Sequence, residues 1–114
     1  DSGAHGIVKS SRAFALNVLG KGQQKLAFAF FKPASVEGDT ISGEKFRAGS
    51  TGAPLLDNAA AFVECRVVNS VEGGDHTVFV AEVVEAGVAK APSGRADDAT
   101  LWMKELGDTV FYGG

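Results

Sequence analysis

Hydrophobic spacing in the first third of the chain predicts one strand followed by one short helix. Residues 13–19, AFALNVL, place Phe14, Leu16 and Val18 on one face at the two-residue period of a β-strand. Two glycines interrupt this pattern, and the following QQKLAFAFF combines good helix formers with apolar residues until Pro33. Because proline cannot continue a helix, the helix is expected to start near position 23 and to stop before Pro33.

The second half of the chain has the spacing of a β-hairpin. Residues 61–69, AFVECRVVN, and residues 77–85, TVFVAEVVE, have the length of strands and are rich in valine and phenylalanine. The segment between them, SVEGGD, supplies glycines and an aspartate for a turn. The two strands are therefore expected to pair in antiparallel orientation.

The two hairpin strands differ in how their faces are expected to be buried. Alternation in the first strand puts Val63, Cys65 and Val67 on a face that should belong to the core. Glu64 and Arg66 share the opposite face, which is expected to be partly hydrated. The second strand is apolar on both faces near its centre, which favours a barrel or a sheet covered by another subunit.

Residues 34–58 have instead the composition of a long connecting loop. They are rich in glycine, serine, threonine and aspartate, with Ile41, Phe46 and the pair Leu55 and Leu56 as apolar anchors. Connections of this length in compact domains are usually functional or mobile. The pattern as a whole predicts about three or four strands and two short helices, too few strands to close a barrel.

Composition and charge narrow the classes of function. The chain has 114 residues, enough for one domain, with 45% apolar and 22% charged residues, the balance of a globular protein. A net charge of −3 and scattered basic residues argue against nucleic acid as a partner. No apolar run approaches the ~20 residues that span a bilayer, so no membrane partner is expected either.

The few cysteine and histidine residues exclude further chemistries. With Cys65 as the only cysteine, no disulfide can form within the chain, and one cysteine with two histidines cannot build a zinc site alone. This usage fits a reducing cytoplasm, with Cys65 as a buried structural residue. The glycine-rich pieces at 20–22 and 49–52 match neither the phosphate loop nor the dinucleotide fingerprint. No Rossmann or Walker nucleotide site is expected.

A series of short motifs resembles one known family. In chain order they are SRAFALNVL at 11–19, QKLA at 24–27 leading to Phe30 and Phe31, GAPLLD at 52–57, Glu64 with Cys65, GDHT followed by VFVAEV at 74–83, and YGG at 112–114. Their order and spacing resemble the flavin reductase-like domains, which share the FMN-binding split-barrel fold. The resemblance covers nearly the whole chain, and GDHT with the strand after it is its most specific part.

The resemblance implies a mainly β, antiparallel, Greek-key-like split barrel with short helices. Family members carry a further segment upstream, with the first barrel strands and a turn rich in serine and threonine for the flavin phosphate. The chain opens with Asp1 instead of methionine, and residues 7–12 are already helix-compatible. Residues 1–114 are therefore expected to form the C-terminal two-thirds of a flavin reductase-like domain that is incomplete at its N-terminus.

The same resemblance implies an NAD(P)H-dependent flavin reductase. FMN or FAD would lie in a groove at a homodimer interface, and NADH or NADPH would stack its nicotinamide on the flavin and pass hydride to N5. A monooxygenase or another redox partner would take the electrons. Two alternatives stay open: an electron-relay module of a larger diflavin or flavodiiron protein, and a non-catalytic FMN-binding or dimerisation module. No acidic or basic residue stands out as a reader of the dinucleotide ribose.

Five residues are the candidates for contact with flavin and nicotinamide: Asn17, Gln24, Lys25, Asp75 and His76. The resemblance implies that His76, the catalytic candidate, points into the groove, and that Asp75 shapes the turn and orients the imidazole. It places Asn17 near the flavin, while Gln24 and Lys25 open a helix whose N-terminus would meet a phosphate.

Each candidate also has a purely structural interpretation. Asp75 suits a turn on conformational grounds alone, and His76 would then only hydrogen-bond a loop. A buried asparagine such as Asn17 often satisfies backbone groups, and Gln24 with Lys25 suits a solvated helix face. Trp102, Phe111 and Tyr112 are expected to pack on a partner subunit in preference to covering the flavin edge.

Overall fold

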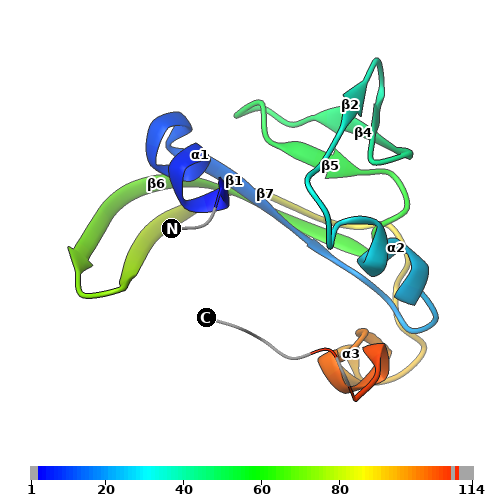
Figure 1. The fold of residues 1–114 in the computed structure, drawn as a ribbon. Helices are drawn as coiled ribbons and strands as arrows, with labels where there is room; N and C mark the ends of the chain where they lie inside the picture. Colours follow the sequence, from blue (N-terminus) through cyan, green and yellow to red (C-terminus); the bar gives the residue numbers. More distant parts are fainter. Residues whose placement is uncertain (1–2, 109, 111–114) are drawn as a thin grey trace.

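Two antiparallel sheets with short helices at their ends make up the fold, in a computed structural model that describes residues 3–108 and 110 (Figure 1). The elements are α1 Gly3–Ser11, β1 Ala13–Val18, α2 Gln24–Ala29, β2 Val36–Glu37, β3 Thr40–Ile41, β4 Glu44–Ala48, β5 Pro54–Leu56, β6 Ala61–Gly73, β7 His76–Val88, α3 Ala96–Ala99 and the 3₁₀ helix η1 Met103–Leu106. One sheet has the order β1-β6-β7 and the other the order β2-β3-β4-β5. This confirms the mainly β class.

The hairpin of β6 and β7 is confirmed and is longer than expected. Each strand has 13 residues, and the pairing of Gly73 with His76 leaves only Gly74 and Asp75 in the turn. Gly74 has φ 67°, a left-handed conformation that glycine adopts without steric cost. In Figure 1 the hairpin extends at the left, away from the second sheet, so its tip projects from the body of the chain.

The expectation of a long loop over residues 34–58 is wrong, and so is the low strand count. This segment folds into β2 to β5, which brings the described chain to seven strands. Tight turns reverse the backbone within it, with φ 61° at Gly38 and φ 83° at Gly43. Because β2 and β3 have only two residues each, they are too short to show any alternation in the sequence.

The burial expected for the hairpin strands is partly corrected. Cys65 and Val67 lie in the core as predicted, each 5% exposed, but Glu64 is fully buried instead of hydrated. A β-bulge falls between Glu64 and Cys65, and the turn between β4 and β5 covers the carboxylate. The expectation that β7 is buried on both faces is wrong for the chain by itself, since Val78 and Val83 are each 59% exposed.

The predicted strand at 13–19 and the helix before Pro33 are confirmed as β1 and α2. Leu26 of α2 is buried, as are Leu55 of β5 and Ala59 in the connection that follows. These apolar residues belong to the same buried core as Cys65 and Val67. Across the described residues, no helix has both the length and the apolar character that a membrane crossing requires.

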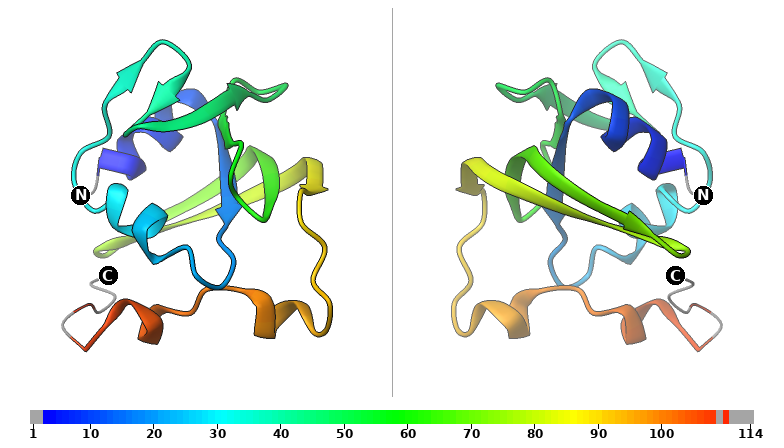
Figure 2. Two further views of the ribbon diagram at one scale, coloured as in Figure 1. Left: turned by 90° about the vertical axis from the view of Figure 1, so that its right-hand side faces the viewer. Right: turned by 90° about the vertical axis from the view of Figure 1, so that its left-hand side faces the viewer.

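The segment after β7 returns to the loop between β1 and α2. Figure 2 shows α3 and η1 running beneath that loop, where the Lys21 amide donates to the Ala99 carbonyl at 3.0 Å.

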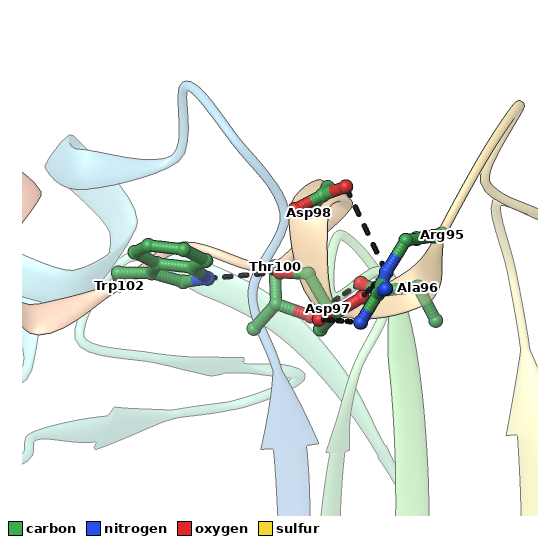
Figure 3. A network of polar contacts seen from close by, with 6 residues as sticks. All are labelled: Arg95, Ala96, Asp97, Asp98, Thr100 and Trp102. Carbon is green, nitrogen blue, oxygen red and sulfur yellow. Dashed lines mark hydrogen bonds and ion pairs between the residues drawn. The ribbon is translucent and has the colours of Figure 1, made fainter.

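Within the segment, the Trp102 indole N–H donates to the Asp97 carbonyl at 2.8 Å, and the Arg95 guanidinium donates two hydrogen bonds to the Asp97 carboxylate (Figure 3). Trp102 thus lies on its own chain, 40% exposed. Phe111, Tyr112 and the YGG motif lie outside the described residues.

Candidate functional site

The tip of the long hairpin carries the Asp75 and His76 pair. His76 is the first residue of β7, and its Nδ1–H donates to the Asp75 carboxylate at 2.8 Å. The His76 side chain is 64% exposed and the Asp75 side chain is 95% exposed. With Nδ1 held by the carboxylate, Nε2 of a neutral imidazole is left as a hydrogen-bond acceptor. The contact by which Asp75 was expected to orient the imidazole is therefore present.

Asn17 uses its amide to join the two sheets. The side-chain oxygen accepts a hydrogen bond from the Leu56 N–H at 2.8 Å, and the side-chain nitrogen donates to the Pro54 carbonyl at 3.2 Å. These bonds bridge β1 to β5 at a place where the two strands are not paired through their backbones. These hydrogen bonds agree with the structural interpretation of Asn17. A contact between Asn17 and flavin stays a prediction.

Gln24 and Lys25 lie in the first turn of α2, a helix of six residues. The preceding Gln23 is the residue that fixes the loop, because its amide accepts from the Gly20 N–H at 2.8 Å and donates to the Asn58 carbonyl at 2.7 Å. Lys25 is exposed and Gln24 is half-buried. Figure 1 shows α2 and the hairpin tip on opposite sides of the chain, so one copy does not bring the five candidates together.

Sequence reasoning missed the role of Glu64. Its buried carboxylate accepts hydrogen bonds from the backbone N–H and the hydroxyl of both Ser50 and Thr51. These bonds, led by the one from the Thr51 hydroxyl, hold the pKa of Glu64 below its usual value. The carboxylate therefore fixes the β4–β5 turn and, through β5, the two backbone groups that bond Asn17. The only indication of this contact in the sequence was the pair of hydroxyl residues Ser50 and Thr51 between two glycines.

Two cavities lie away from the hairpin tip. The larger has a volume of about 320 Å³ and lies between the residues that follow α2 and the strands β2 and β3. The smaller has about 170 Å³, with Phe62 and Arg47 in its wall. The Arg47 guanidinium lies 5.5 Å from the centre of the Phe62 ring and 3.6 Å from the Asp57 carboxylate. None of the five candidate residues lines either cavity.

The chain is similar in sequence to a known protein family and to several of its members. The model of the family described as "Flavin reductase like domain" matches residues 1–106. The reductase component of a 4-nitrophenol 4-monooxygenase/4-nitrocatechol 2-monooxygenase from Rhodococcus opacus is 39% identical over 84 residues, which are 74% of this chain and 43% of that protein. An NADH-dependent FAD reductase from Streptomyces globisporus is 37% identical over 75% of this chain and 48% of its own length.

Solved structures give the same result. The NADH:FAD oxidoreductase SgcE6 from Streptomyces globisporus C-1027 superposes with a TM-score of 0.65 at 37% identity, covering 77% of this chain and 53% of that one. The same protein has been solved in complex with NAD and FAD fragments. Diflavin flavoprotein A 1 from Synechocystis is 30% identical over 80% of this chain and 16% of its own length. The chain spans about half the length of the first two relatives.

Proposed function

The chain belongs to the flavin reductase-like domain family, and on that premise we propose that it is the flavin-reducing part of an NAD(P)H:flavin oxidoreductase. The observation that carries the proposal is 37% identity, over 77% of this chain, to an NADH:FAD oxidoreductase. The GDHT turn supports it, because the structure builds a paired Asp75 and His76 at an exposed tip. FMN or FAD would be the acceptor, and NADH or NADPH the donor.

The residues at the hairpin tip fit a planar redox group. Nε2 of His76 is placed to hydrogen-bond a ligand, and Asp75 holds the ring so that this nitrogen keeps one orientation. Bound flavin supplies the chemistry, as the acceptor of hydride from the nicotinamide. The chain contributes position: a two-residue turn ahead of a 13-residue strand holds the imidazole near a fixed plane, and hydride transfer needs reacting atoms about 3–3.5 Å apart.

A homodimer is part of the proposal because a second copy would supply the wall that faces the exposed tip. The hairpin next to His76 exposes valines on both strands, with Val71 and Val78 directly paired and each 59% exposed. Exposed apolar surface of this kind commonly marks an interaction site, and a second copy would cover it while supplying the facing wall of the groove. Sedimentation velocity of the full chain tests this, and a monomer at micromolar concentration in the presence of FMN would contradict it.

The reductase activity is tested by anaerobic mixing of the full chain with FMN, or separately FAD, and NADH. Loss of the flavin absorbance in the visible range is the expected result. His76→Ala should slow this loss by about tenfold to a hundredfold, because an oriented hydrogen bond to the reacting group is removed. Flavin that binds yet keeps its absorbance in the unaltered chain would refute the proposal.

A second candidate function is an electron-relay module, which the similarity to diflavin flavoproteins favours. Such a module would pass electrons from its flavin to another domain. We distinguish the two by adding a monooxygenase component or cytochrome c as acceptor: a reductase supplies reduced flavin in solution, whereas a relay transfers electrons only from bound flavin. The buried free thiol of Cys65 agrees with a cytoplasmic setting for either function.

A further inference from the structure

The two faces of the hairpin tip differ in exposure. At the start of β7, His76 and Val78 are exposed, whereas Thr77 and Phe79 between and after them are half-buried. Successive side chains of a strand point to opposite faces, so one face of the tip is open and the other is covered. The His5 ring of α1 lies against the covered face, with its centroid 5.9 Å from that of Phe79 (Figure 1).

Two residues of α1 reach both strands of the tip. Nε2 of His5 lies 3.1 Å from the Thr77 hydroxyl oxygen, and the Lys9 ammonium donates to the Glu72 carboxylate at 2.7 Å. Residues four apart lie about 5–6 Å from each other on one face of a helix. Glu72 and Thr77 are directly paired across β6 and β7, and the Cβ atoms of such pairs are about 4.5–5.5 Å apart. The spacing on the helix therefore matches the spacing across the hairpin.

These contacts lie immediately behind the turn. The next pair of residues, Gly73 and His76, closes it. Gly73 and Gly74 give this stretch more backbone freedom than other residues would, so a contact from outside the turn restrains it. The hydrogen bond from Lys9 is the main cause that holds the pKa of Glu72 below its ordinary value, which keeps the carboxylate charged at neutral pH.

The helix that makes these contacts is fixed at its far end. Arg12, which follows α1, has φ 61°, and its carbonyl accepts a hydrogen bond from the N–H of buried Val67 at 2.8 Å. No residue of α1 is itself buried. The position of the helix therefore depends on this anchor and on its contacts at the surface of the hairpin.

From this geometry we propose that His5 and Lys9 are positioning residues for the His76 imidazole. They hold the Glu72–Thr77 pair from the covered face, so that the turn keeps one orientation and the open face is left to ligands. The inference rests on the proposed function, in which His76 contacts flavin or nicotinamide. Sequence reasoning missed this role because the two contacts join residues 72 and 63 positions apart.

Hydrogen exchange of the unliganded full chain, followed by mass spectrometry in peptides that contain residues 71–78, tests the contacts without any redox activity. Lys9→Ala should speed exchange of these amides by about twofold to fivefold, the modest effect of an exposed ion pair. Thr77→Val keeps the shape of the side chain without its hydroxyl and should have a similar effect, about twofold to fivefold. Ser10→Ala is the control, because it removes a hydrogen bond within the helix alone, and it should exchange as the unaltered chain does.

Charge reversal and kinetics separate positioning from a general effect on folding. Lys9→Glu should loosen the tip further, because two like charges then face each other, and Lys9→Glu combined with Glu72→Lys should restore slow exchange. With saturating FMN and NADH, Lys9→Ala should lower kcat by about twofold to fivefold and leave the Kd for FMN unchanged, since it alters the orientation of the tip without removing a ligand contact.

Unaltered exchange of the tip in both Lys9→Ala and Thr77→Val would overturn the inference, as would a charge reversal that Glu72→Lys does not restore. Faster exchange with an unchanged kcat would overturn the positioning role, because the tip would then loosen without effect on the reaction. Weaker FMN binding in Lys9→Ala would also count against it. If the unaltered chain never reduces flavin, the proposed function fails, and the exchange rates alone decide whether α1 holds the turn.

Discussion

Gly49 stands at the point where the β4–β5 turn meets the buried carboxylate, and Gly49→Ala tests that contact. A Cβ built at this position would lie 2.4 Å from Oε2 of Glu64 and 2.5 Å from its Oε1. A clash with the end of a flexible side chain is usually relieved by a small rotation. Glu64 cannot rotate away at low cost because its two oxygens hold the turn through four hydrogen bonds and it is fully buried. The backbone must shift or those bonds must break.

Overpacking of a filled site costs about 1–3 kcal/mol in free energy of unfolding. For a chain of 114 residues, the entropy of unfolding is about 0.24 kcal/mol/K. Gly49→Ala should therefore lower Tm by about 4–12 °C in a thermal melt followed by circular dichroism. Gly94→Ala is the matched control, because nothing lies within 4 Å of its Cβ position, and it should shift stability by less than about 0.5 kcal/mol.

A double-mutant cycle identifies the cause of the loss. In a Glu64→Ala background the carboxylate is absent, so Gly49→Ala should have little further effect on stability. Equal losses in the two backgrounds would mean that the alanine disturbs the turn itself, and the assignment of Glu64 as its anchor would be refuted. The assignment would also be refuted if Gly49→Ala had the same Tm as the unaltered chain.

Three further changes probe the described contacts. The pKa of Glu64 in the folded chain lies below its ordinary value of 4.5. The stabilising effect of the carboxylate is therefore present above about pH 4.5 and is lost as pH falls through the folded pKa. The difference in Tm between the unaltered chain and Glu64→Gln should shrink over that acidic range. Asn17→Ala leaves the Leu56 N–H and the Pro54 carbonyl without their partner and should cost about 1–3 kcal/mol in urea unfolding, with the Kd for FMN unchanged if Asn17 only joins the sheets. Gly87→Ala puts a Cβ 2.5 Å from Cε1 of Phe62 and should lower Tm, and this loss should vanish in Phe62→Ala.

The parts of the fold that the sequence predicted are those specified by long, regular patterns. β1, α2 and the β6–β7 hairpin each have several apolar residues at one period, and the hairpin turn is marked by Gly74 and Asp75. β2 to β5 were missed because they have two to five residues each and few apolar side chains. Their position depends on the turns between them and on contacts with β1 and β6, which no local pattern reveals.

The burial of Glu64 was not predictable for a related reason. Alternation places it on the same face as Arg66, and that face is hydrated where nothing covers it. The turn of Ser50 and Thr51, which lie 14 and 13 residues earlier in the chain, covers the carboxylate and supplies its hydrogen bonds. A charged residue can be buried only where such donors are fixed in place, and that condition belongs to the assembled fold.

The candidate site divides in the same way between local and distant contacts. Asp75 and His76 are neighbours in sequence, so a turn that holds the imidazole could be anticipated from the residues alone, and the 2.8 Å contact is present. Asn17 was grouped with them through the family resemblance, and Gln24 and Lys25 because they open a helix whose N-terminus could meet a phosphate, yet α2 lies across the chain from the hairpin tip. If all five residues serve one flavin, the two groups must come from different copies. A mixed dimer of one His76→Ala chain and one Lys25→Ala chain should then regain one intact site, about half of the unaltered dimer's activity, whereas residues that act within one copy would give no recovery.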